Sequence, residues 1–299
     1  MITCLNLGKY GRLGNQLFQY AAARGVAEKI GAECKIPDYD SFEWHGQPCL
    51  LRNFNLQATR LTPEDYGKIQ RTFMEPDSNK FYPALLESTP NTNISGFFQF
   101  IPYFEHCEEL LREEFTPKTE FLQTASSVLD PYRAEGYETV SIHIRRGDMM
   151  THMYRDTGVS PDQVFGAEDI FDESTIYGAY LHKAMDHFKD RKVKYFVFAG
   201  GMRDGDDAQD IEYIRRVFAG DQYVISETND AMSDFTLMMS CDHNITCHQS
   251  TFGWWAAHLN NNPDKIVTSP AHYYFLMPRE VNDNRMKNGH FPPDWTIIE

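Results

Sequence analysis

The chain has 299 residues, enough for about two domains of ordinary size that each bury a core. Hydrophobic residues make up 41% and aromatic residues 14%, which is typical of a folded globular protein and excludes a disordered one. The formal net charge of -15 repels nucleic acid phosphates and anionic lipid, so we exclude both as general partners. An anionic ligand then requires a local basic cluster that acts against the overall field.

From the sequence we expect no targeting or membrane segment. Residues 2–7 are typical of a strand and lack the basic start and apolar middle of a signal peptide, and no apolar run approaches the roughly 20 residues of a membrane span. Cys241 and Cys247 lie near His243 and His248, which raises zinc as an alternative, but the tight Cys-x-x-Cys pairs of structural zinc sites are absent. We expect reduced thiols, a cytoplasmic location and no metal.

The first half of the chain predicts a strand over 1–7, a glycine-rich turn and a helix over 15–30. Phe18, Ala22, Val26 and Ile30 recur every four residues and form the buried stripe of that helix. A less regular region follows. Beyond it we expect a strand over 94–98 and helices over 104–115 and 118–134.

The second half alternates strands and helices more regularly. The predicted strands cover 139–145, 194–199, 222–226, 242–246 and 265–268, and the predicted helices cover 173–189, 207–219, 230–240 and 250–261. This alternation is typical of a parallel sheet with helices on both faces. Such sheets bind ligands at the carboxyl ends of their strands, so motifs at strand-to-helix junctions carry the most weight.

The segment His143-Ile-Arg-Arg-Gly-Asp148 ends the first of these strands. Side chains alternate along a strand, so His143 and Arg145 are predicted to point the same way. The adjacent guanidinium groups of Arg145 and Arg146 repel each other unless an anion or carboxylate lies between them, and their planar forks suit phosphate. The alternative is a salt bridge with Asp148 above a core histidine. The strand-end position in so acidic a protein favours phosphate binding.

The segment His248-Gln-Ser-Thr-Phe-Gly-Trp-Trp255 follows a strand and opens a helix. The first N–H groups of a helix are unpaired and its dipole adds positive charge, so this end is suited to an anion. We expect Ser250 or Thr251 to bond a phosphate oxygen; the alternative is that Ser250 is only the N-cap. Trp254 and Trp255 are expected in the core.

Two further segments carry weaker signals. Gly11-Arg-Leu-Gly-Asn-Gln16 follows the first strand, where a glycine-rich turn lets a ligand approach the backbone, although an ordinary tight turn fits equally well. It does not match the dinucleotide pattern Gly-x-Gly-x-x-Gly. Residues 149–172 are long, polar and without periodicity, which predicts a lid or acceptor-binding loop, or else a disordered surface excursion.

Together these segments resemble the α-1,2-fucosyltransferase family of bacterial and animal enzymes, glycosyltransferase family 11. No single match is decisive, but five occur in the family's order and span most of the chain. They are Gly11-Arg-Leu-Gly-Asn-Gln-Leu-Phe-Gln-Tyr20, Gly96-Phe-Phe-Gln-Phe100 with Tyr103-Phe104, His143-Ile-Arg-Arg-Gly-Asp148, Asp234-Phe-Thr-Leu-Met-Met-Ser-Cys241 and Ser250-Thr-Phe-Gly-Trp-Trp255.

The resemblance implies an α/β fold of the GT-B type, with two Rossmann-like domains facing a cleft. We place an acceptor-side domain at 1–135, a nucleotide-sugar domain at 136–275, and a tail at 276–299 that packs back on the N-terminal domain. The implied reaction is an inverting transfer of L-fucose from GDP-fucose to the 2-hydroxyl of a galactose-terminated glycan, in polysaccharide or O-antigen biosynthesis. It requires no metal or other cofactor, and a lipid-linked acceptor would bring the enzyme to a membrane surface.

The resemblance also implies roles for individual residues. The arginines hold the diphosphate, the hydroxyls at the helix end hold the β-phosphate, and the N-terminal turn faces the reacting sugar. A strand-end acid or histidine takes the acceptor proton, or else only orients the arginines. The arginines are Arg145 and Arg146, and the hydroxyls are those of Ser250 and Thr251. The N-terminal turn contributes Arg12, Asn15 and Gln16, and the strand-end acid and histidine are Asp148 and His143.

Some positions depart from the family's pattern. Gly200-Gly201 stands where a pair of aspartates is usual, and the acidic residues Asp204, Asp206 and Asp207 come later. Met149 replaces a usual aromatic residue, and His248-Gln249 replaces a more usual Ala-Asn. These departures leave two alternatives: a same-fold transferase with a different GDP-sugar, or a catalytically decayed nucleotide-sugar- or glycan-binding protein.

Overall fold

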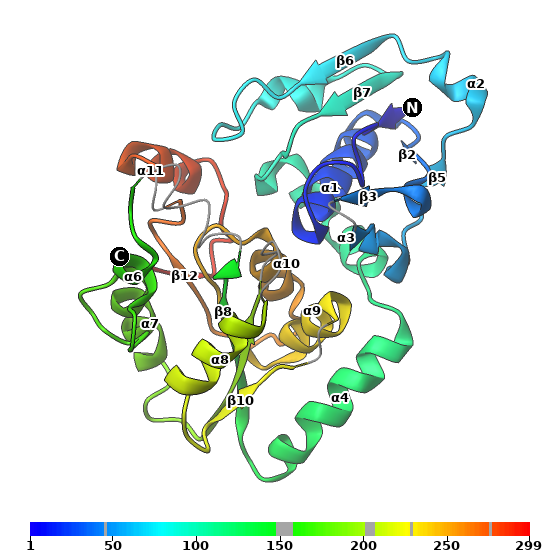
Figure 1. The fold of residues 1–299 in the computed structure, drawn as a ribbon. Helices are drawn as coiled ribbons and strands as arrows, with labels where there is room; N and C mark the ends of the chain where they lie inside the picture. The colour runs from blue at the N-terminus through cyan, green and yellow to red at the C-terminus, as the bar shows by residue number, and fades with distance from the viewer. Residues whose placement is uncertain (45–46, 148–157, 201–206, 228–229, 275–276) are drawn as a thin grey trace. The chain divides into compact units, whose positions relative to one another are not determined.

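The computed structural model describes the chain apart from residues 45–46, 148–157, 201–206, 228–229 and 275–276 (Figure 1). The described residues form two compact units. Unit 1 comprises Met1–Lys118 and Asp283–Pro293, and unit 2 comprises Thr119–Asn282 and Asp294–Glu299. The expected boundary at 135 falls at the end of α4, Thr119–Ala134, which is grouped with unit 2.

Unit 1 contains a parallel sheet of order β1-β7-β6, formed by Ile2–Thr3, Thr92–Ser95 and Arg71–Met74. The strand predicted over 1–7 is much shorter, because the chain turns after Thr3 and Gly8 adopts a φ of 83°. The other elements are short: β2 (Lys35–Ile36), η1 (Tyr39–Ser41), β3 (Glu43–Trp44), β4 (Gln47–Pro48), η2 (Leu50–Asn53), β5 (Thr59–Arg60), α2 (Pro63–Tyr66), η3 (Pro83–Glu87), η4 (Ile101–Tyr103), η5 (Glu105–Cys107) and α3 (Glu108–Glu114).

The long helix α1, Leu13–Ile30, forms the centre of unit 1. The predicted stripe is largely confirmed, since Phe18, Ala22 and Val26 are fully buried. Burial extends around most of the helix because small residues let neighbours approach: a Cβ on Gly25 would lie 2.1 Å from the carbonyl oxygen of Tyr103. The start of α1 is therefore held in place by the packing of its whole length.

Unit 2 contains a six-stranded parallel sheet of order β10-β9-β8-β11-β12-β13. The predicted alternation of strands and helices is confirmed, but two C-terminal elements were not predicted: β13, which adds an edge strand, and α11. The elements are β8 (Glu138–Ile144), α6 (Pro161–Phe165), α7 (Ile176–Asp186), β9 (Val193–Ala199), α8 (Asp207–Val217), β10 (Tyr223–Ile225), α9 (Ala231–Ser240), β11 (His243–Ile245), α10 (Thr251–Leu259), β12 (Val267–Pro270), α11 (Arg279–Lys287) and β13 (Thr296–Ile298).

The two faces of this sheet pack against different helices. Val140, Ile142 and Ile144 of β8 point into a core shared with α6, α7 and α8. Ser141 and His143 point the other way, where α4, α9 and α10 pack together. This alternation sets the direction of every side chain that follows along the strand.

The prediction of an irregular stretch over 149–172 is wrong at residues 161–165, which form α6. Residues 148–157 lie outside the described residues, but α6 forms beyond them, with Ser160 and Gln163 in a capping box. Val164, Phe165 and Ile170 are buried in the core of unit 2. This part of the segment is thus a structural element and not a surface excursion.

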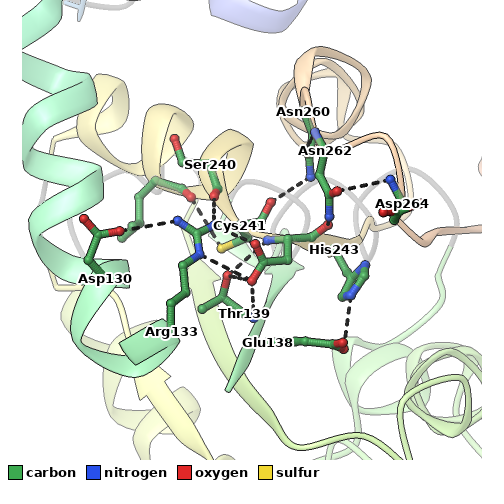
Figure 2. Close-up of polar contacts among 12 residues, drawn as sticks. Asp130, Arg133, Glu138, Thr139, Ser240, Cys241, His243, Asn260, Asn262 and Asp264 are labelled. Carbon is green, nitrogen blue, oxygen red and sulfur yellow. Dashed lines mark hydrogen bonds and ion pairs between the residues drawn. The ribbon is translucent and has the colours of Figure 1, made fainter. Parts of the chain in front are cut away.

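A polar network fastens the amino-terminal edge of the same sheet (Figure 2). Arg133 of α4 donates to Asp242 at 2.8 Å and to the carbonyl oxygen of Ser240 at 2.6 Å. Asp242 also accepts from the backbone N–H of Thr139 at 2.7 Å. Burial alone would raise the pKa of Asp242, but the bonds from Arg133 and Thr139 outweigh it and lower that pKa. Charge-assisted hydrogen bonds therefore hold together the amino-terminal ends of the strands, opposite the ends where ligands are expected.

Candidate functional site

Two of the sequence motifs meet at one point of the unit 2 sheet. β11 pairs with β8, although β9 and β10 come between them in the chain. In parallel sheets, ligands bind outside the carboxyl ends of the strands where the strand order reverses in this way. Arg145 directly follows β8, and the segment that opens α10 follows β11. Both motifs therefore lie where the topology predicts a ligand.

Arg145 contacts the turn that leads into α10. Its Nη1 donates a hydrogen bond to the carbonyl oxygen of Gln249, and its backbone N–H donates to the hydroxyl of Tyr177 at 3.4 Å. Gln249 has a φ of 52°, a left-handed conformation that is uncommon outside glycine. The Arg145 guanidinium is thus held at the start of α10, against the residue that precedes Ser250.

The two hydroxyl-bearing residues at the start of α10 lie in different environments. Ser250 is the N-cap, its Oγ accepts from the backbone N–H of Gly253 at 3.4 Å, and the residue is 2% exposed. Thr251 is half-buried, so solvent reaches it more readily. Trp254 and Trp255 are buried, as predicted. Ser250 therefore shapes the helix start, and Thr251 is the hydroxyl better placed for a ligand.

His143 supports this helix start from the strand beneath it. A Cβ on Gly253 would lie 2.4 Å from Nδ1 of His143, so only glycine lets α10 begin so close to β8. Nδ1 of His143 also lies 3.3 Å from Sγ of Cys247. Burial raises the pKa of Cys247 to about 11, which keeps this thiol neutral. A buried histidine in this position fits support of α10 better than general-base catalysis.

Arg146 occupies a different environment from Arg145. Its guanidinium carbon lies 3.8 Å from the ring centroid of Tyr213 on α8 and 5.3 Å from that of Phe165 on α6. The Tyr213 hydroxyl donates to the carbonyl oxygens of Phe165 and Gly166 at 2.7 and 3.0 Å, which ties α8 to α6. Adjacent strand-end side chains point to opposite faces, so the two arginines diverge. A diphosphate role for Arg146 stays a prediction.

The N-terminal turn of unit 1 is a tightly bonded structure. Gln16 is 3% exposed, donates from Nε2 to the carbonyl oxygen of Gly11 at 2.9 Å and accepts from the Cys49 thiol at 3.2 Å. Gly11 has a φ of 72°, as a glycine-specific turn requires. Arg12 is the half-buried N-cap of α1, and Asn15 on the first turn accepts from Gln99 at 3.0 Å. Gln16 therefore shapes the turn from within, while Arg12 and Asn15 lie nearer its surface.

Several predicted features cannot be placed. Asp148, Met149, Gly201, Asp204 and Asp206 lie outside the described residues.

In the part of the chain that the structure describes, no three His, Cys, Asp or Glu side chains are grouped so that they could hold a metal ion. Over the same residues, no helix is both long and apolar enough to cross a membrane.

The fold resembles that of solved fucosyltransferases. The NodZ α-1,6-fucosyltransferase co-crystallised with GDP aligns over 90% of this chain and 94% of its own, with 14% identity and a TM-score of 0.50. POFUT1 in complex with GDP aligns over 89% of this chain and 98% of its own, with 12% identity and a TM-score of 0.51. The predicted fold class, α/β of the GT-B type, is thereby confirmed.

The sequence identifies the family. The chain belongs to glycosyl transferase family 11, whose model matches residues 4–299. It is 30% identical over 259 residues to galactoside α-(1,2)-fucosyltransferase 1 of Rattus norvegicus, covering 83% of this chain. It spans only 61% of the length of that relative. It is also 25% identical over 316 residues to the O-antigen biosynthesis glycosyltransferase WbnK of Escherichia coli, covering 92% of this chain and 95% of the relative.

Proposed function

We propose that the protein transfers L-fucose from GDP-fucose to the 2-hydroxyl of a β-galactoside, with inversion and without a metal. The observation that carries the proposal is the contact between Arg145 and Gln249, which holds a guanidinium at the start of α10. The names of the relatives support the linkage and the galactoside acceptor. The GDP in two structures of similar fold supports the donor.

The chemistry of sugar transfer requires such a group. In glycosyl transfer the anomeric carbon becomes oxocarbenium-like, and negative charge builds on the departing diphosphate. Donors and dipoles that are already oriented toward this charge lower the barrier without reorganising. Arg145 and the amino end of α10 converge at one strand tip, so both would stabilise the same leaving group. The hydroxyl of half-buried Thr251 would add a hydrogen bond to it.

Replacing Arg145 tests the proposal directly. We expect Arg145→Ala to lower GDP-fucose turnover by roughly 100-fold or more, the scale for losing one oriented charge-stabilising donor. Arg145→Lys should retain part of the activity, because it keeps the charge but loses the planar fork. Arg191→Ala is the matched control, since that arginine pairs with Glu138 at 2.9 Å at the opposite edge of the sheet. Wild-type turnover in Arg145→Ala would refute the assignment.

Calorimetry with GDP, UDP and ADP tests the donor class separately. We expect GDP to bind and the other two to bind much more weakly. Transfer from GDP-fucose to lactose, with the product linkage determined by NMR, tests the acceptor and the 2-hydroxyl. Binding of GDP together with turnover of another GDP-sugar would replace fucose as the substrate. Binding of GDP-fucose without any transfer would identify a decayed enzyme.

A further inference from the structure

We propose that Tyr177 is a positioning residue for the transfer reaction. From α7, its hydroxyl fixes the main chain at the tip of β8, and so fixes where Arg145 holds its guanidinium. The charge that Arg145 stabilises rests on the proposed function. The positioning itself rests on contacts within unit 2 alone, to which every residue in the argument belongs.

The tip of β8 extends beyond the pairing of this strand with β11. That pairing ends at Ile142 and Ile245, whereas the pairing of β8 with β9 continues as far as Ile144 and Ala199. On the side of β11, the main chain of residues 143–145 therefore lies beyond the ladder of hydrogen bonds that holds the rest of the strand. These are the residues that lead into the arginine motif.

The hydroxyl of Tyr177 bonds the main chain just where that pairing has ended. It donates to the carbonyl oxygen of His143 at 3.3 Å and accepts from the backbone N–H of Arg145 at 3.4 Å. A carbonyl only accepts and a backbone N–H only donates, so a single atom that bridges them must do both, as a neutral hydroxyl does. Both distances are long for hydrogen bonds, so we expect a smaller effect than that of removing Arg145 itself.

The environment of this hydroxyl keeps its proton in place. Tyr177 is 1% exposed, and burial, followed by the charge of Cys247, raises the pKa of Tyr177 well above its usual value. A phenolate could accept from Arg145 but could not donate to His143. The bridge across the strand tip therefore stays in one form over the ordinary pH range.

The first turn of α7 is held firmly enough to act as a reference for the strand. Thr175 is the N-cap, and its Oγ1 accepts from the backbone N–H of Gly178 at 3.0 Å. A Cβ on Gly178 would lie 2.1 Å from the carbonyl oxygen of Asp172, so the preceding turn packs directly against the helix start. The ring centroid of Tyr177 lies 4.9 Å from that of Phe165 on α6. The position of the hydroxyl is thus set by the helix and by the packing of its ring.

The same helix holds the segment that Arg145 contacts. The hydroxyl of Tyr180, one turn along α7, donates to the main-chain carbonyl directly after β11 at 2.8 Å. The His248 ring lies against both tyrosines, with its centroid 5.2 Å from that of Tyr177 and 5.5 Å from that of Tyr180. The next residue is Gln249, whose carbonyl oxygen accepts from Arg145. α7 therefore fixes the arginine and its acceptor relative to each other.

Tyr177→Phe removes the hydroxyl and keeps the ring. We expect a lower Tm, because two main-chain groups lose a partner, and a roughly 10-fold fall in kcat for GDP-fucose. The KM should change by less than about 3-fold, because a misplaced guanidinium fails mainly against charge that develops in the transition state.

Ser141→Ala is the matched control, since it also removes one buried hydroxyl from the surroundings of β8. Ser141 is 1% exposed, and its Oγ accepts from Nδ2 of Asn244 at 2.8 Å, in the middle of the strand. This variant should lower Tm and leave kcat unchanged. A wild-type kcat in Tyr177→Phe, or a fall no larger than that of Ser141→Ala, would overturn the inference.

A double variant tests whether Tyr177 acts through Arg145. In the Arg145→Ala background no guanidinium is left to misplace, so Tyr177→Phe should lower kcat by less than about 2-fold. A further fall of roughly 10-fold in that background would show that Tyr177 affects turnover independently of Arg145, which contradicts the inference.

A readout that needs no activity separates the inference from the proposed function. If the wild-type protein does not turn over GDP-fucose, the proposed function fails. The backbone 15N–1H signal of Arg145, in protein labelled with 15N-arginine and assigned by its absence in Arg145→Lys, then decides the positioning. We expect this amide to exchange slowly with solvent in the wild type, and its signal to shift strongly in Tyr177→Phe and little in Ser141→Ala. Rapid exchange in the wild type, or an unchanged signal in Tyr177→Phe, would refute the inference whatever the substrate.

Discussion

The substitution Gly253→Ala should disturb the geometry of the site in unit 2 much more than it lowers the stability of that unit. The added Cβ would lie 2.4 Å from Nδ1 of His143, about 1 Å closer than an ordinary contact, and both residues are buried. Overpacking of this kind costs about 1–3 kcal/mol. Alanine favours a helix over glycine by up to about 1 kcal/mol, which offsets part of that cost. We therefore expect a folded protein destabilised by roughly 0–2 kcal/mol.

The effect on function should be much larger. The clash is relieved only if His143 or the start of α10 moves, and either movement disturbs the position of Gln249 relative to Arg145. A displacement of about 1 Å in a catalytic site lowers rates on the order of 100-fold. Urea denaturation, calorimetry with GDP and initial transfer rates measure the two effects separately.

Two variants make the test specific. Gly67→Ala is the control, because a Cβ there meets only the carbonyl oxygen of Glu64 at 3.5 Å and the residue has a negative φ of −69°. It should change neither quantity. His143→Ala combined with Gly253→Ala should recover GDP affinity relative to Gly253→Ala, because it removes the atom that clashes. Wild-type GDP affinity and transfer rate in Gly253→Ala would refute the requirement for close approach of α10 to β8.

Two other predictions concern stability. Burial, and then the charge of His272, lowers the pKa of His248 to about 3, so between about pH 6.5 and 3 only the unfolded chain binds this proton. Acidification should then cost about 1.4 kcal/mol per pH unit, and His248→Phe should reduce the loss in unfolding free energy between pH 7 and 5 by about 2 kcal/mol. An unaltered pH dependence of the unfolding free energy in His248→Phe would contradict the assignment. Arg133→Met removes the bonds to Asp242 and Ser240, so urea denaturation should show a loss of about 1–3 kcal/mol, while transfer per folded molecule stays near wild type because this edge is opposite the strand tips. A large loss of transfer with little loss of stability would show that this edge affects the site.

The fold of unit 2 could be predicted because its signals are local. The periods of two and 3.6 residues mark strands and helices, and parallel order follows from their alternation. The same logic accounts for the proximity of Arg145 to the start of α10, since the carboxyl ends of parallel strands lie at one end of the sheet. The capping box of Ser160 and Gln163 was also readable, and it would have identified α6.

The features that were missed depend on contacts between distant segments. Arg146 stacks on Tyr213 because α8 packs on the same face of the sheet, and no local pattern in either segment encodes that packing. Gln99 was part of a recognised motif, but its link to Arg285 spans 186 positions. β13 joins the edge of the sheet after many residues that lie outside it. Neither its place in the strand order nor its register with β12 could therefore be predicted from the sequence.

The chain passes from unit 1 to unit 2 after Lys118, returns to unit 1 at Asp283 and re-enters unit 2 at Asp294. During translation, therefore, neither unit can be completed until residues 283–299 have left the ribosome, because Arg285 belongs to one and β13 to the other. A fragment ending at Asn282 would lack part of both, so neither unit can be excised as one continuous stretch. Expressing unit 1 by itself would require a linker that joins Lys118 to Asp283.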